Sequence, residues 1–185
     1  FQDEIDARGV FLARVRAALR DVTDEVGATA YLSRYADGEV HLVDIVDAIH
    51  NPRVELWVGL HSSAHATALG KQILADLTPE DRHDYLSRHP LEQLTHRTIS
   101  DRRTLLTQLE HSPGWAVDME EYAIGSTCVA VPVIAPHVNA SLAISLPSDT
   151  AVVDRSLVRK LHVAARRLSL QLGADQMDTG SEFTI

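Results

Sequence analysis

Apolar residues recur at helical spacing over the first 26 residues of the chain, between acidic and basic side chains. This period predicts one long amphipathic helix over residues 1–26. A second stripe of the same period predicts another helix over residues 153–172, with basic residues on its polar side. The apolar positions of the first helix are Phe11, Val15, Leu19, Val22 and Val26.

Between these two helices, runs of alternating apolar and polar residues predict β-strands. The runs 28–35 and 39–47 flank Asp37-Gly38, a pair that tolerates the positive φ of a tight turn, and so they predict a hairpin. The run 54–60 predicts a third strand. Three more strands are predicted over 115–120, 126–135 and 140–146, with a turn from Pro136 to Asn139 between the last two.

Three helices are predicted between the third and fourth strands. The first covers about residues 64–77. Thr78 followed by Pro79 starts the second, because threonine caps a helix and proline suits its first turn. Ser100 is the expected cap of the third. Strands joined by short turns, with helices between the two groups, predict an α+β fold with an antiparallel sheet.

The chain is long enough for one well-filled core, which we place in residues 27–172, with the helix 1–26 as a linker or signalling helix packed on it. Residues 173–185 are polar and are expected to form a flexible tail, in part a remnant of cloning. The chain begins at Phe1 rather than at a methionine, so we expect a further segment upstream.

Composition narrows the class of protein. The chain is 45% apolar and 23% charged, as in a soluble globular protein, and it contains no apolar run long enough for a membrane span. Its single cysteine, Cys128, excludes an internal disulfide and fits the cytoplasm. A net charge of −9 argues against direct contact with nucleic acid. The basic residues near the C-terminus are expected to form a solvated helix face: Arg155, Arg159, Lys160, Arg166 and Arg167.

Two patterns would suit an enzyme. His61 and His65 lie four residues apart, as zinc ligands on a helix do, although the glutamate of the zinc-protease signature is absent. Cys128 lies in a predicted strand, where it is either a buried apolar residue, part of a pocket wall, or a nucleophile that would need a histidine base.

Two other patterns suit the binding of a ligand. Alternation would place Asp118 and Glu120 on one face of their strand, either at an exposed strand end or in a pocket. Gly70-Lys71 lacks the spacing of a phosphate-binding loop. The small residues before it, Ala64, Ala66, Thr67 and Ala68, would let an anion approach the free N–H groups of a helix start.

Taken together and in order, three segments resemble the effector-binding domain of IclR-type transcriptional regulators. They are HATALGKQILADL, HRTISDRRTLLTQLEHSPGWAVDMEEYAIGSTCVAVPV and SLAISLP. The resemblance covers about residues 10–172. It implies a GAF-like domain with a six-stranded antiparallel sheet, flanking helices and a pocket for a small organic acid. It also implies a homodimer or tetramer, and DNA binding only through an N-terminal winged helix-turn-helix that is absent from this chain.

The family's effector contacts map onto individual positions of this sequence. The resemblance implies backbone contacts from Ala68 and Leu69, and side-chain contacts from Asp118, Cys128 and Ser145. Two positions depart from the family: Pro147 stands where a second serine is expected, and Ser63 stands where proline is common.

We therefore expect a cytoplasmic ligand sensor that is no enzyme and needs no metal or other cofactor. The alternative is a small cytoplasmic enzyme that uses Cys128 or a metal held by His61 and His65. A third reading is an oligomerisation scaffold whose pocket has lost its ligand.

Overall fold

A computed structural model of the chain describes residues 2–51, 53–55 and 58–179. Its centre is one antiparallel sheet of five strands in the order β2-β1-β5-β4-β3. The strands are β1 (Thr29–Ala36), β2 (Glu39–Val46), β3 (Ala116–Met119), β4 (Ser126–Ala135) and β5 (Val138–Pro147). The helices are α1 (Gln2–Val26), α2 (Leu60–Ser63), the 3-10 turn η1 (Ala64–Ala66), α3 (Ala68–Asp76), α4 (Pro79–Arg88), α5 (Arg102–Glu110) and α6 (Arg155–Thr179).

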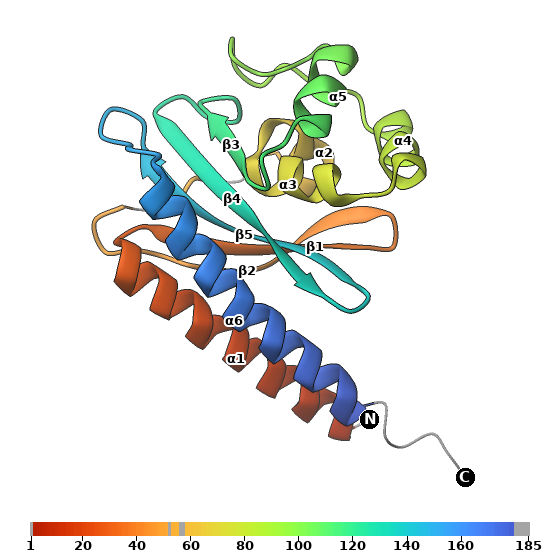
Figure 1. The fold of residues 1–185 in the computed structure, drawn as a ribbon, viewed down its shortest axis with the longest axis vertical. Coiled ribbons are helices and arrows are strands. Elements are labelled where there is room, and N and C mark those ends of the chain that lie inside the picture. The colour runs from red at the N-terminus through yellow and green to blue at the C-terminus, as the bar shows by residue number, and fades with distance from the viewer. Residues whose placement is uncertain (1, 52, 56–57, 180–185) are drawn as a thin grey trace.

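Helices cover both faces of the sheet. The long helices α1 and α6 lie side by side on one face, whereas α2 to α5 gather over the other (Figure 1). Each face has its own apolar core, and alternate residues of β4 serve them in turn. Val129 and Val131 belong to the core under α1 and α6, and Ala130 belongs to the core under α3. The predicted α+β class with an antiparallel sheet is confirmed.

Turn chemistry explains the two hairpins. Asp37 and Gly38 join β1 to β2 with φ of 53° and 77°, in the region that the Asp-Gly pair predicts. His137, with φ of 59°, lies in the turn between β4 and β5. Both hairpins follow the sequence prediction.

The predicted third strand over residues 54–60 was wrong for the residues that the structure describes. Val54, Glu55, Val58 and Gly59 lie outside any strand, and Leu60 begins α2; Leu56 and Trp57 lie outside the described residues. The backbone groups here find side-chain partners instead of a neighbouring strand: the N–H of Val54 donates to the Tyr31 hydroxyl, and the N–H of Val58 to the Tyr122 hydroxyl. The described sheet therefore has five strands and not the six expected.

The helix predicted over residues 64–77 is broken at Thr67, which is extended with φ −109° and ψ 145°. The break lets Gly70 pack closely against Ala64. The packing is so close that an added Cβ at Gly70 would lie 2.2 Å from the Cα of Ala64. The second predicted helix is confirmed, with Thr78 as its cap. The cap of α5 is Asp101, whose carboxylate accepts the N–H of Thr104, and not Ser100.

The C-terminal helix is longer than predicted, since it continues past Leu172 to Thr179. The remaining part of the expected tail, residues 180–185, lies outside the described residues. None of the helices in the described part of the chain is both long enough and apolar enough to cross a lipid bilayer.

Candidate ligand-binding site

The start of α3 is a buried helix N-terminus. Thr67 caps it: the N–H of Gly70 donates to the Thr67 hydroxyl over 3.0 Å. The first N–H groups of a helix have no acceptor within the helix. Ala68 and Leu69 provide such groups, and both residues are buried. This end of α3 carries the partial positive charge of the helix dipole, which favours an anion nearby.

A small cavity of about 30 Å³ lies against this helix start. This is roughly the volume that one water molecule takes up in the liquid. Four of the five predicted site residues, Ala68, Leu69, Asp118 and Cys128, line it together. The other lining residues are Tyr31, Val54, Thr67, Tyr122 and Ala143.

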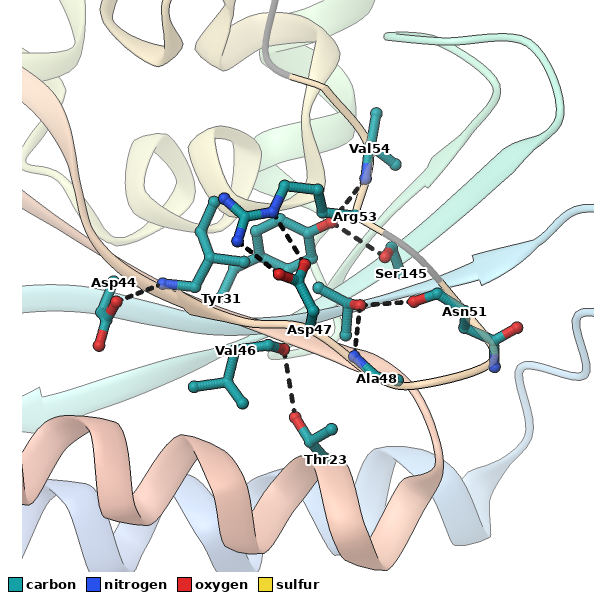
Figure 2. A network of polar contacts seen from close by, with 12 residues as sticks. Thr23, Tyr31, Asp44, Val46, Asp47, Ala48, Asn51, Arg53, Val54 and Ser145 are labelled. Carbon is teal, nitrogen blue, oxygen red and sulfur yellow. Dashed lines mark hydrogen bonds and ion pairs between the residues drawn. The ribbon is translucent and has the colours of Figure 1, made fainter.

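The fifth predicted residue, Ser145, lines a separate cavity of about 190 Å³. Ser145 is the register partner of Cys128 in the neighbouring strand, so the two cavities are adjacent. The Ser145 hydroxyl lies 3.0 Å from the Tyr31 hydroxyl, which belongs to the wall of the smaller cavity (Figure 2). We call the 30 Å³ space the inner cavity and the 190 Å³ space the outer cavity. The outer cavity is lined by His50, Asn51, Val54, Gly125, Ser126, Ser145, Leu146 and Pro147.

Asp118 at the end of β3 is only 2% exposed. Its Oδ1 accepts the N–H of Glu121 at 2.6 Å and the N–H of Tyr122 at 3.3 Å. Burial raises the pKa of Asp118 to about 7, and the Glu121 carboxylate adds to the rise. The two N–H donors and the Lys71 ammonium act in the opposite direction and favour the ionised form.

The predicted pairing of Asp118 with Glu120 on one strand face was wrong. The strand ends at Met119, and Glu120 has φ of 62°, so the chain turns before alternation can continue. This turn buries Glu121 instead. Its carboxylate forms an ion pair with the ammonium of Lys71 on α3, with Nζ–Oε distances of 2.7 and 2.9 Å.

The environment of Cys128 does not activate its thiol. Burial raises the pKa of Cys128 to about 12, and the nearby Asp118 adds to the rise. Its sulfur lies 3.7 Å from the hydroxyl of Ser126, which is no base. A nucleophilic cysteine needs a lowered pKa, so Cys128 is suited to line a cavity.

The two histidines of the alternative enzyme hypothesis, His61 and His65, do not come together as metal ligands. His65 is buried, and its Nε2 lies 2.9 Å from the carbonyl oxygen of Glu92. Burial lowers the pKa of His65. The His61 side chain is exposed, and its carbonyl accepts the Tyr85 hydroxyl. Within the described ranges, no three His, Cys, Asp or Glu side chains gather as a metal site would require.

The sequence pattern marked Thr67 only as a small residue at a helix start and not as the cap, and it did not mark Tyr31 or Tyr122. A threonine directly before small helical residues is a cap signal, so Thr67 could have been found. Tyr31 and Tyr122 come from segments far away in the chain, and no local pattern marks them as cavity residues.

Comparisons with known proteins converge on one family. Residues 8–172 match the model of the bacterial transcriptional regulator IclR C-terminal domain. The HTH-type transcriptional regulator KdgR of Dickeya chrysanthemi is 31% identical over 161 residues, which are 84% of this chain and 53% of that protein. The chain therefore spans about half the length of this curated relative.

Solved structures agree. The C-terminal domain of the E. coli regulator KdgR is 28% identical, with a TM-score of 0.75, over 88% of this chain and 99% of that one. An IclR homolog from Microbacterium hydrocarbonoxydans, complexed with 4-hydroxybenzoate, is 25% identical with a TM-score of 0.77, over 92% of this chain and 73% of that one.

Proposed function

The chain belongs to the family of bacterial transcriptional regulators that share the IclR C-terminal domain, and on this premise we propose that it senses a small organic acid. The family is one of transcriptional regulators and not of enzymes. The observation that supports the proposal most is the inner cavity, where a buried helix start meets Asp118 and Cys128.

The chemistry of this cavity favours a carboxylate that also carries a hydroxyl group. The N–H groups of Ala68 and Leu69 would receive the carboxylate at the positive end of α3. Asp118 would bond to the ligand hydroxyl, because an ionised Asp118 would repel a second carboxylate. The 4-hydroxybenzoate in the complex of the structural relative carries both a carboxylate and a hydroxyl group.

Binding requires the cavity to enlarge. Pockets for small organic ligands measure roughly 300–1,000 Å³, whereas the inner cavity measures about 30 Å³. A ligand that fits only the enlarged form would stabilise that form by its difference in affinity for the two states. This difference in binding free energy is the amount by which the ligand can shift the equilibrium between the two forms of a sensor.

We further propose that the whole protein is a cytoplasmic, oligomeric regulator with a GAF-like sensor, and that an upstream domain binds DNA. The helix α1 would connect the sensor to that domain. Its residues Val15, Leu19 and Val22 are buried in the core that α1 shares with the sheet and α6. A change in the sheet would therefore reach α1 through direct packing.

The test is calorimetry with lactate, 4-hydroxybenzoate and the neutral lactamide. We expect at least one of the two acids to bind and lactamide not to bind. The sharpest variant is Ala68→Pro, because it removes one N–H at a helix position that suits proline. Thr67 already has the extended backbone that precedes proline.

We expect Ala68→Pro to weaken binding of the acid at least tenfold while α3 remains folded. Asp118→Ala and Cys128→Ala should each weaken it as well. Unchanged affinity in all three folded variants would place the site elsewhere, and the absence of binding by any acid of the series would reject the proposal.

A further inference from the structure

The hydroxyl of Tyr31 occupies an unusual position in this site. Tyr31 belongs to β1 and is 4% exposed. Its oxygen accepts the N–H of Val54 at 2.9 Å and lies 3.0 Å from the hydroxyl of Ser145 on β5. Figure 2 shows this oxygen between the two partners. One side chain thus joins the sheet to Val54, which lies outside any strand.

These hydrogen bonds lie at the boundary between the two cavities. Tyr31 lines the inner cavity, Ser145 lines the outer one, and Val54 lines both. The phenol and its two partners therefore separate the helix start at Ala68 from the polar groups of the outer cavity.

Residues close to Val54 are positioned by contacts that do not involve Tyr31. Arg53 forms a two-pronged ion pair with Asp47. The Thr29 hydroxyl accepts the N–H of Ala48 and donates to the carbonyl of Asn51. Ala48 and Asn51 are thus bonded to β1 through Thr29, and Arg53, the residue before Val54, is bonded to Asp47, so the bond from Val54 to Tyr31 forms between two positioned groups.

We propose that Tyr31 is the residue that sets the length of the effector, a step that rests on the proposed function. With the phenol in place, the carboxylate at Ala68 and the rest of the ligand must fit on the inner side, which selects a compact hydroxy acid. Without the phenol, the two cavities join, and an aromatic hydroxy acid can extend its hydroxyl toward Ser145.

Two acids of the same chemistry and different length test this inference. Lactate and 4-hydroxybenzoate each carry one carboxylate and one hydroxyl. Calorimetry gives the ratio of their dissociation constants for wild type, Tyr31→Phe and Tyr31→Ala. We expect wild type to prefer lactate, and Tyr31→Ala to shift the ratio at least tenfold toward 4-hydroxybenzoate. Tyr31→Phe should shift it less, in the same direction, because it releases Ser145 but keeps the ring.

Tyr35→Ala is the matched control. Tyr35 lies on the same strand four residues away and packs against the same core, but it lines neither cavity. Its variant should leave the ratio unchanged. If Tyr31→Ala fails to fold by circular dichroism, Tyr31→Phe decides the question alone, with a threefold shift as the limit.

The possible failures are distinguishable. If wild type binds lactate and the folded Tyr31 variants keep its ratio, the inference about Tyr31 is overturned and the proposed function stands. The same holds if wild type already prefers 4-hydroxybenzoate. If neither acid binds to wild type or to any variant, both the proposed function and this inference are overturned.

Discussion

The ammonium of Lys71 lies 2.7 Å from one carboxylate oxygen of Glu121 and 2.9 Å from the other. The Lys71 side chain is 2% exposed and the Glu121 side chain 10%. This buried pair joins α3, which carries the helix start at Ala68, to the turn whose N–H groups hold Asp118. Two walls of the inner cavity are therefore connected by one ion pair.

Removal of one partner from this pair should cost far more than removal of both. Lys71→Met leaves the Glu121 carboxylate buried without its cation, so we expect the free energy of unfolding to fall by about 3–5 kcal/mol. The double variant Lys71→Met with Glu121→Gln should recover most of this loss. Urea denaturation of the three proteins measures both effects.

The ion pair between Arg53 and Asp47 serves as the control, since both of its side chains are nearly half exposed. Arg53→Met should cost less than about 1 kcal/mol, as surface pairs do. A loss of the same size at both positions would contradict the structural role assigned to the Lys71 pair.

Asp118 should make the chain less stable as the pH rises. Its pKa is about 7 in the folded chain and about 3.9 in an unfolded one. Between these values the folded state holds a proton that the unfolded state has lost. The stability that this proton contributes is complete below about pH 4 and is lost as the pH rises to about 7.

Asp118→Asn cannot lose a proton, and its side-chain oxygen can still accept the two N–H groups. Its free energy of unfolding, minus that of wild type, should therefore increase by on the order of 1 kcal/mol per pH unit across this window. Urea denaturation of both proteins at pH 5 and pH 8 measures the difference. Equal differences at the two pH values would show that Asp118 has an ordinary pKa.

Two threonine caps in the chain allow an effect on stability to be separated from an effect on ligand binding. Thr67 caps α3 at the inner cavity, and Thr78 caps α4 away from it. Thr67→Ala and Thr78→Ala should each lower the free energy of unfolding by about 1 kcal/mol. Only Thr67→Ala should also weaken binding of the acid, because it disturbs the helix start that receives the carboxylate. Equal affinities in the two variants would argue against that role.

Two helical glycines should respond to alanine in opposite directions. At Gly70 a Cβ would lie 2.2 Å from the Cα of Ala64, a backbone atom that cannot move away freely, so Gly70→Ala should prevent α3 from packing. At Gly9 in α1 nothing lies within 4 Å, so Gly9→Ala should stabilise the chain by about 0.5–1 kcal/mol. Thermal unfolding followed by circular dichroism compares them. A stable Gly70→Ala variant would show that η1 and α3 need not pack so closely.

Most of the fold was accessible from local patterns. Asp37-Gly38 predicted its hairpin because the turn needs the positive φ that these two residues tolerate. The segment 54–60 was wrongly predicted as a strand because apolar alternation does not reveal which partners its backbone groups will find. Its N–H groups at Val54 and Val58 are satisfied by tyrosine hydroxyls from distant parts of the chain.

The candidate site, like the fold, was only partly predictable from the sequence. Ala68, Leu69, Asp118 and Cys128, which the family resemblance marks as effector contacts, line one cavity. Ser145 is beyond the phenol of Tyr31, in the outer cavity. That separation depends on a side chain that is 114 positions away in sequence, so no motif around Ser145 could report it.

The pairing of β1 with β5 also has a consequence for the order in which the chain assembles. Thr29 pairs with Ser145 and Tyr35 with Asn139, so the centre of the sheet closes only when nearly the whole chain is present. On the ribosome, β1 and the apolar side of α1 emerge long before β5 and α6, their partners. We expect nascent chains that stop before residue 138 to expose this surface and to depend on chaperones or aggregate.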